Sequence, residues 1–149
     1  MTPTQVNIGI KKIKDTEFFV DEAIVLSDPF TANIGFELTT NVNLAERTIE
    51  LLLTAFFTVQ EHSTLFMKIK TSNVFMVQEV EEFMNTEKKV FNIPDNIMVT
   101  LFSLSISHTR ALLAKNAMGT KFSEIYLPII NPTEILKQIM GIHLSKNGE

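Results

Sequence analysis

The stretch TIELLLTAFFTVQ, residues 48–60, has an apolar side chain at every second position. One row of this alternation is apolar throughout and consists of Ile49, Leu51, Leu53, Ala55, Phe57 and Val59. Alternation over this length is typical of a β-strand with one buried face. The second row is mixed, because Leu52 and Phe56 interrupt its polar residues. We therefore predict a strand whose second face is also partly apolar.

Three neighbouring segments show the same extended pattern. Alternation runs over residues 6–20, 34–44 and 65–77, and the charges near Asp15 predict a bulge or bend within the first of them. Turn-forming residues separate the segments at 26–30 and 61–64. Four consecutive strands with short connections predict an antiparallel meander.

The second half of the chain predicts helices. From Asp95 to Met118 apolar residues recur at helical spacing, and Gly119 is placed to end this helix. The residues on the opposite side of the helix are small and uncharged: Thr100, Ser103, Ser105, Ser107 and Thr109. This composition predicts that the helix is packed on two sides. Arg110 is the exception, and we expect it to bond a carboxylate or carbonyl groups across a packed contact.

The remaining segments complete the expected fold. Residues 79–94 predict a short acidic helix or loop, and residues 122–130 an irregular loop. Asn131 is placed to cap a short final helix that ends near Gly141. The sequence thus predicts one α+β domain over residues 1–149, with a four-stranded antiparallel sheet followed by a long helix, an irregular loop and a short C-terminal helix.

Composition narrows the classes of function. A chain of 149 residues with 45% apolar content can bury one core unaided. The absence of cysteine excludes thiol catalysis and is typical of a reducing compartment. A net charge of -4 argues against binding nucleic acid. No secretory signal pattern and no stretch of about 18 uninterrupted apolar residues occurs, so we expect a cytoplasmic protein that does not insert into membranes.

Side chains that carry catalytic chemistry are scattered. His62, His108 and His143 lack the spacing of paired helical metal ligands, and the five glycines form no phosphate-binding loop. Asp15 and Glu17 come nearest to an acid–base pair, since residues two apart on a strand project to one face. Solvated edge charges explain them equally well. We therefore expect no metal, no cofactor and no enzymatic activity, and we interpret the chain as a binding protein.

The two faces of the predicted sheet lead to a hypothesis about binding. One long and one short helix can cover only about one face of four strands. Leu52, Phe56 and Phe66 are predicted to lie on the other face, where they would form a larger apolar patch than soluble monomers usually expose. We expect subunits, a partner protein or an extended apolar segment of a client to cover it.

The order of these elements and three short segments resemble the SecB family of protein-export chaperones, over about residues 6–140. Val6–Phe18 resembles the family's first strand, with its Lys-Asp step at Lys14 and a Phe three residues after the Asp. Arg110, followed by Gly119, Thr120 and Phe122, resembles the end of its long helix. Ile125–Asn131 is similar to the Leu-x-Leu-x-Pro-Val/Ile-Asn passage before its final helix.

This resemblance implies an ATP-independent holdase, a homotetramer built as a dimer of dimers, that binds unfolded preproteins in hydrophobic grooves for protein export. By the same resemblance, the client-binding residues are Phe30, Phe36, Leu38, Phe56, Ile135 and Ile139. Asp15 and Glu17 are the candidate residues for docking a partner, which would be the translocase motor SecA or an antitoxin, since SecB-like chaperones also serve toxin–antitoxin systems.

Two other classes of protein stay open at this level. A small oligomeric adaptor could recognise one partner through Asp15, Glu17, Asp21 and Glu22, with a steep dependence on salt. A ligand carrier or enzyme could hold a pocket between sheet and helices, although no residue pattern names a reaction.

Overall fold

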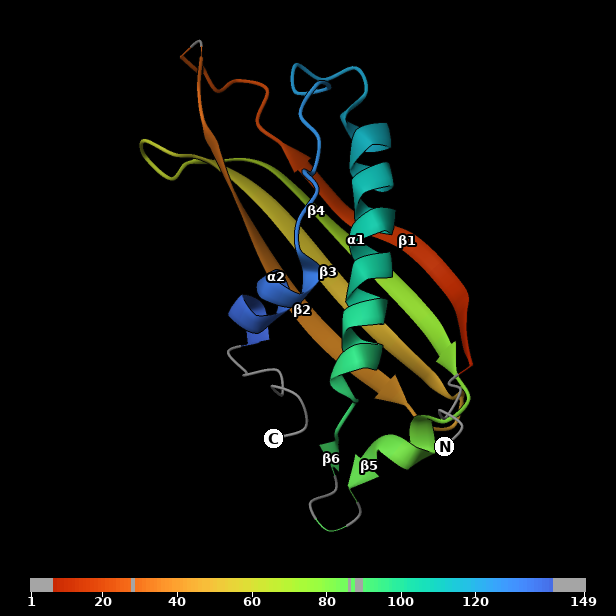
Figure 1. The fold of residues 1–149 in the computed structure, drawn as a ribbon. Helices are drawn as coiled ribbons and strands as arrows, with labels where there is room; N and C mark the ends of the chain where they lie inside the picture. The colour runs from red at the N-terminus through yellow and green to blue at the C-terminus, as the bar shows by residue number, and fades with distance from the viewer. Residues whose placement is uncertain (1–6, 28, 86, 88–89, 141–149) are drawn as a thin grey trace.

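The structure, a computed structural model, describes residues 7–27, 29–85, 87 and 90–140 (Figure 1). Its strands are β1 (Ile8–Val20), β2 (Ala32–Asn43), β3 (Thr48–Val59), β4 (Leu65–Val77), β5 (Met84–Asn85) and β6 (Val90–Phe91). Its helices are the 3-10 helix η1 (Val80–Phe83), α1 (Asp95–Ala117) and α2 (Pro132–Met140). The predicted α+β fold is confirmed. Predictions for His143 and for the chain before Asn7 fall outside the described residues.

The order of the strands differs from the predicted meander. The four long strands are antiparallel, but they lie in the order β1-β4-β3-β2, so that only β2, β3 and β4 follow one another as hairpins. β1 pairs with β4, and the chain then crosses one end of the sheet to reach β2 (Figure 1). The connection over residues 21–31 is long enough for this crossing, whereas a meander needs only a tight turn.

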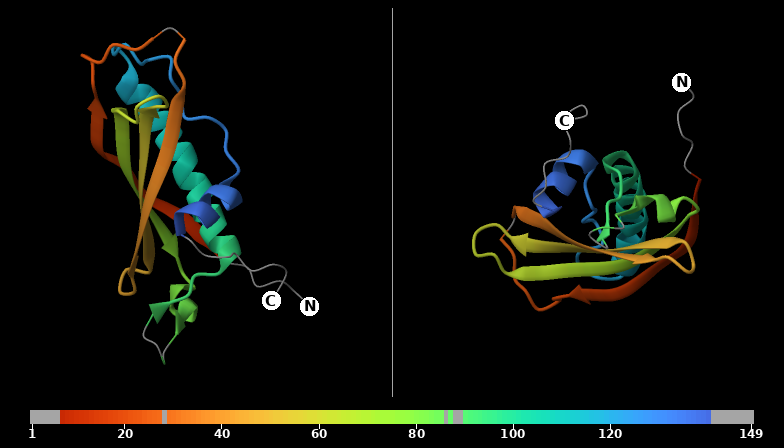
Figure 2. Two further views of the ribbon diagram at one scale, coloured as in Figure 1. Left: turned by 90° about the vertical axis from the view of Figure 1, so that its left-hand side faces the viewer. Right: turned by 90° about the horizontal axis from the view of Figure 1, so that it is seen from below.

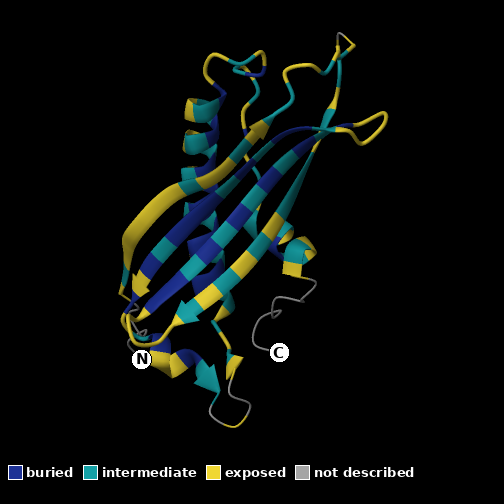
Figure 3. Ribbon diagram, turned by 180° about the vertical axis from the view of Figure 1, so that it is seen from behind, coloured by how far each residue is buried: buried dark blue, intermediate teal, exposed yellow. Residues whose placement is uncertain are grey.

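Both α-helices lie on one face of the sheet (Figure 2). The apolar row of β3 meets them there, and its six residues from Ile49 to Val59 are at most 2% exposed. On α1, Leu101, Phe102 and Leu113 are fully buried on the same side. No described element covers the other face, which Figure 3 shows from behind. The predicted division into a covered and an open face is therefore present.

Two β-bulges in β1 decide which way its side chains point. The pairing with β4 shifts between Asp15 and Glu17, so Asp15 opposes Thr71 on the helix side, whereas Glu17 opposes Lys70 on the open side. The prediction that Asp15 and Glu17 share a face is wrong, and the bulge expected near Asp15 is the reason. One extra residue in a strand reverses the side on which all later residues lie.

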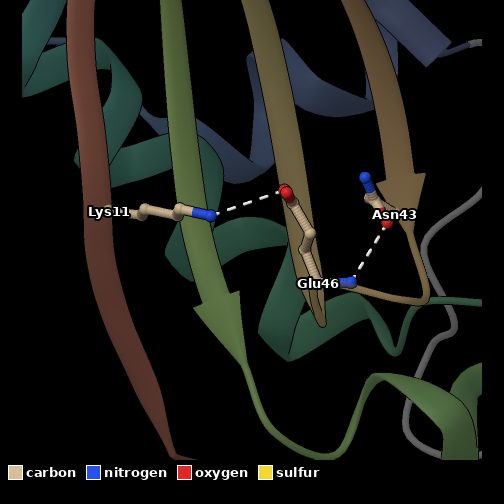
Figure 4. Close-up of polar contacts among 3 residues, drawn as sticks. All are labelled: Lys11, Asn43 and Glu46. Atoms are coloured by element: carbon tan, nitrogen blue, oxygen red, sulfur yellow. Dashed lines mark hydrogen bonds and ion pairs between the residues drawn. The ribbon is translucent and has the colours of Figure 1, made fainter.

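The other bulge in β1 lies at Lys11, between Ile10 and Lys12. The Lys11 ammonium reaches across the open face to the Glu46 carboxylate, at 3.4 Å, in the turn between β2 and β3 (Figure 4). The backbone N–H of Glu46 donates to Oδ1 of Asn43 at 3.1 Å, which orders this turn. Because the ion pair is exposed to water, it contributes little to stability.

A third bulge corrects the prediction for Phe66. Thr58 opposes Leu65 while Phe57 opposes Met67, which leaves Phe66 as an inserted residue. Phe66 is fully buried, and its ring lies 4.9 Å from that of Phe122 on the helix side. Leu52 and Phe56 remain half-buried on the open face. The apolar patch on that face is thus smaller than the alternation of β4 predicts.

Small polar residues of α1 are satisfied within the fold. Ser105 and Thr109 donate to carbonyl oxygens one turn earlier, and Thr109 also bonds the Thr71 hydroxyl at 2.8 Å. Asn73 donates to the Leu51 carbonyl at 3.1 Å and meets Nδ1 of His108 at 2.9 Å. A polar core of this kind fixes α1 in register on β4, because any slip would leave buried groups unpaired.

By length and composition α1 could also cross a membrane, with a mean hydropathy of 1.4 over its most apolar window. The packing of α1 explains its apolar composition in another way. One side of the helix is buried on the sheet, and Arg110 on a neighbouring side binds the loop before α2, so few positions of the helix are exposed to water.

Gly35 offers a test of the packing on the open face. A Cβ at this position would overlap the ring of Phe56, whereas a Cβ at Gly9 would meet nothing nearer than 4.0 Å. We expect Gly35→Ala to lower the free energy of unfolding by about 1–3 kcal/mol, measured by urea denaturation. Gly9→Ala is the control and should leave the free energy of unfolding unchanged. Adding Phe56→Leu to the Gly35→Ala variant should restore part of the lost free energy of unfolding. Equal effects of the two glycine substitutions would contradict the packing.

The stability should depend on pH through His108. Burial lowers the pKa of His108 below its ordinary value of 6.5. The unfolded chain therefore takes up this proton first, so stability is complete above about pH 6.5 and is lost as the pH falls toward the folded-state pKa. We expect denaturation curves to show a decline in stability as the pH falls below about 6.5, and His108→Gln should remove this decline. A flat wild-type profile below about pH 6.5 would be inconsistent with a pKa lowered by the partial burial of the imidazole.

Candidate functional site

The edge of the sheet at β2 is open to a further strand. β2 pairs along one side with β3, in register from Ala32 opposite Val59 to Asn43 opposite Thr48. Within the described part of the chain, no strand pairs with its other side. The N–H and C=O groups along an unpaired edge can bond an added extended chain irrespective of its sequence.

α2 lies beside this edge on the helix side of the sheet (Figures 1 and 2). The helix begins as predicted, because Oδ1 of Asn131 accepts the Glu134 N–H at 3.2 Å and Pro132 occupies its first position. Leu136 is buried, whereas Ile135 and Ile139 are half-buried against the core. The helix therefore presents an incompletely covered apolar side next to β2.

Arg110 of α1 holds the loop that leads into α2. Its Nε donates to the Leu127 carbonyl at 2.9 Å and its terminal nitrogen to the Pro128 carbonyl at 2.8 Å. The Leu127 side chain is only 2% exposed, so the loop is anchored in the core at the same point. Of the two partners predicted for Arg110 across a packed contact, a carboxylate or carbonyl groups, the structure shows the carbonyl groups. The planar guanidinium suits two neighbouring acceptors.

Four of the six candidate client-binding residues lie on neighbouring elements of this region. Phe36 and Leu38 of β2 oppose Ala55 and Leu53, which places them on the helix side, where they are half-buried. Ile135 and Ile139 come from α2 on that same side. We call the four residues Phe36, Leu38, Ile135 and Ile139, together with the β2 edge, the β2–α2 surface.

The other two candidates lie elsewhere. Phe30 precedes β2 at the crossing end of the sheet, where its ring meets Phe66 edge-on at 5.8 Å. Phe56 is on the open face and packs over Gly35, so it cannot join the β2–α2 surface. This corrects its grouping with the residues of α2. The alternation along β3 already places Phe56 on the face opposite the buried row, so the sequence itself indicated that Phe56 points away from α2.

A cavity of about 540 Å³ continues the β2–α2 surface at one end. It is lined by Thr40, Val42, Phe91, Asn92, Ile93, Asp95, Met98 and Met140. The sequence did not single out these residues as a site, because Phe91–Ile93 belong to a connection with no clear periodicity, whereas Asp95 and Met98 were assigned to the long helix. Thr40 and Val42 do continue the alternate row of Phe36 and Leu38, and that row could have pointed to them.

The candidate partner-docking carboxylates are each engaged within the chain. Asn116 of α1 donates to Asp15 at 2.9 Å, and this hydrogen bond lowers the pKa of Asp15. Lys68 pairs with Glu17 at 2.8 Å and lowers the pKa of Glu17. The two groups lie on opposite faces and do not form one docking site. No group of three or more metal-ligating side chains occurs among the residues that the structure describes.

Comparison with known proteins supports the fold. No family model and no curated protein sequence matches the chain. Nine chains of solved structure match it. One is the SecB-like chaperone Rv1957 of Mycobacterium tuberculosis, solved in complex with a ChAD peptide from the HigA1 antitoxin, with a TM-score of 0.56 and 11% sequence identity. The match covers 83% of this chain and 90% of that one, so the fold is SecB-like.

The role of Arg110 in placing α2 can be tested directly. We expect Arg110→Ala to lower the free energy of unfolding by about 1–3 kcal/mol, since two carbonyl groups lose a charged donor. Hydrogen exchange of the amides around Leu127 should accelerate as well. Arg110→Lys keeps the charge but not the planar pair of donors, so it should restore only part of the protection. Unchanged exchange in Arg110→Ala would show that packing alone holds the loop.

Proposed function

We propose that this protein is an ATP-independent holding chaperone that binds unfolded or precursor polypeptides along the β2–α2 surface. The observation that carries the proposal is the juxtaposition of an unpaired strand edge with a row of half-buried apolar side chains. The SecB-like fold supports it, and so does the structural neighbour's complex with a peptide. The proposal assigns the protein no catalytic activity and no cofactor.

The physical basis is selection for unfolded chains. Backbone bonding at the β2 edge requires an extended segment, and folded proteins have few such segments free. The apolar row adds attraction to side chains that a folded protein would bury. Both contributions tolerate many sequences, which a protein with many clients needs. Release can follow from client folding or transfer, so binding needs no nucleotide.

A homotetramer of the dimer-of-dimers type is part of the proposal. Ile10 and Ile13 of β1 are 51% and 43% exposed on the side of α1, next to the second free edge of the sheet. Leu104 and Leu112 of α1 are only half-buried as well. A second copy packed here would cover apolar surface that a monomer leaves in water. A cytoplasmic location is proposed with it, since the clients are unfolded chains before export.

The choice between an export partner and an antitoxin rests on two observations. The neighbour of known structure holds an antitoxin peptide, which favours an antitoxin segment as a client. Asp15 and Glu17 are bonded within the chain and lie on opposite faces, which weakens the case for SecA docking through them. The same separation weakens the alternative of an acidic adaptor surface.

The holding activity can be measured by light scattering. Protein added to a chemically unfolded, aggregation-prone client should suppress scattering without ATP. We expect Ile139→Ser to weaken client binding by about tenfold, because it removes apolar contact from the β2–α2 surface. Gln138→Ser is the matched control, since Gln138 is exposed on the same helix and should not matter.

Failure of the wild-type protein to suppress scattering would exclude the holdase function. If Ile139→Ser and Gln138→Ser weakened client binding equally, client binding would depend on the stability of α2 rather than on apolar contact with Ile139. Sedimentation of both variants separates an effect on client binding from one on assembly.

A further inference from the structure

The open face of the sheet, seen in Figure 3, is divided by charge. The neighbouring strands β1 and β4 carry five of the thirteen Lys and Arg residues of the chain. They are Lys11, Lys12, Lys14, Lys68 and Lys70. β2 and β3 carry neither Lys nor Arg, and their charged residues are Glu37 and Glu50. Because the whole chain has a net charge of -4, the half of the face formed by β1 and β4 differs in sign from the protein as a whole.

Strand pairing places four of these lysines in successive rows on the open face. Lys68 and Lys70 oppose residues of β3 that lie in its open-face row. Lys14 and Lys12 oppose the next two open-face positions of β4. We call Lys12, Lys14, Lys68 and Lys70 the lysine stripe. Successive rows on one face are about 7 Å apart, so the stripe extends over about 20 Å along the strands.

Most of the lysine stripe is free of ion pairs within the chain. Lys68 is the exception, because it pairs with Glu17 at 2.8 Å. Among the residues that the structure describes, no ion pair joins Lys12, Lys14 or Lys70 to a carboxylate. Lys12 and Lys14 are exposed and Lys70 is half-buried, so all three can be reached from the solvent.

Neutral donors, rather than these lysines, bind the Glu50 carboxylate on the same face. The Ser72 hydroxyl donates to Glu50 at 2.5 Å and the Asn41 side-chain amide at 3.1 Å. The Ser72 hydrogen bond is the main cause of the lowered pKa of Glu50, and the charges of Lys12 and Lys70 add smaller contributions. An anion bound over the stripe therefore has no carboxylate to displace from Lys12 or Lys70.

Apolar side chains accompany the lysine stripe. Phe19 opposes Lys68 at one end and is 41% exposed, and Met76 lies beyond the other end and is 45% exposed. Leu52 of β3 is half-buried in the same row as Lys14. The face therefore offers positive charge to acidic groups and apolar contact to the groups beside them.

The spacing of these charges favours a polypeptide over a nucleic acid. Carboxylates at every second position of an extended peptide recur at about 7 Å, which is the spacing of the stripe. A nucleic-acid backbone carries a phosphate at every nucleotide and would be repelled by Glu17 and Glu50, whereas a peptide can place neutral residues there. The stripe also lacks arginine, whose planar guanidinium suits phosphate best.

We propose that the lysine stripe is a docking site for an extended acidic segment of a partner protein, with Asp or Glu at every second position and an apolar residue at one end. The site is separate from the apolar row of the β2–α2 surface, which lies on the opposite face of the sheet. The proposal goes beyond the holding function and does not depend on it. Its partner has the opposite charge to one that would dock through Asp15 and Glu17.

The test uses three synthetic peptides that alternate Thr with a variable residue and end in Leu. The four variable positions are all Glu, all Gln or all Lys, and binding to the full chain is measured by fluorescence anisotropy. The Glu peptide should bind about tenfold more tightly than the Gln peptide at low ionic strength, and this preference should shrink as salt is added. Equal affinity for the Glu and Gln peptides would overturn the docking site.

Paired substitutions locate the binding. Lys14→Gln with Lys70→Gln should reduce the preference for the Glu peptide to about twofold. Lys115→Gln with Lys137→Gln, on α1 and α2, is the charge-matched control and should keep the full preference. Lys14→Glu with Lys70→Glu should instead favour the Lys peptide. An equal loss in the two Gln pairs would show that net charge alone is responsible and would overturn the site.

Other polyanions test the class of the partner. A single-stranded oligonucleotide, and vesicles of phosphatidylcholine with phosphatidylserine, should each bind the chain more weakly than the Glu peptide. Tighter binding of either one would overturn the choice of an acidic polypeptide. None of these titrations uses an unfolded client, so the docking site and the holding function fail separately.

Discussion

The burial of the apolar row of β3 beneath α1 is the contact on which the rest of the structure depends. Every second side chain from Ile49 to Val59 is removed from water on one face of the sheet. A single 23-residue helix is long enough to cover this row and its neighbours on β4. Hydrophobic burial therefore places both helices on one side, and the polar pairs around Thr71 and Asn73 set their register.

The candidate site follows from what α1 leaves uncovered. The helix covers the middle of the sheet, so the corresponding row of β2, including Phe36 and Leu38, is only half-buried. α2 is too short to complete the cover, and its position is set by the loop that Arg110 holds. An edge strand, an apolar row and a short helix are thus assembled into one surface that could hold an extended chain, with a cavity at one end.

The predictions that failed have a common physical cause. Asp15 and Glu17 were expected on one face, and Phe66 on the open face, because alternation assumes an unbroken strand. β1 and β4 each contain an inserted residue that reverses the side on which their later residues lie. The charges near Asp15 indicated a bulge there, but which residue of a strand is inserted is set by the pairing with the partner strand. Phe30 likewise lies with Phe66 at the crossing end rather than beside α2.

What the sequence determined by itself is local: the four long strands, both α-helices and the Asn131 cap. Such features depend on side chains a few residues apart, and the sequence records those spacings directly. Only the tertiary structure decided the strand order, the sides of Asp15 and Phe66, and the pocket that joins Val42, Phe91, Asp95 and Met140. These depend on which distant segments bury their surfaces together, and that choice belongs to the free energy of the whole chain.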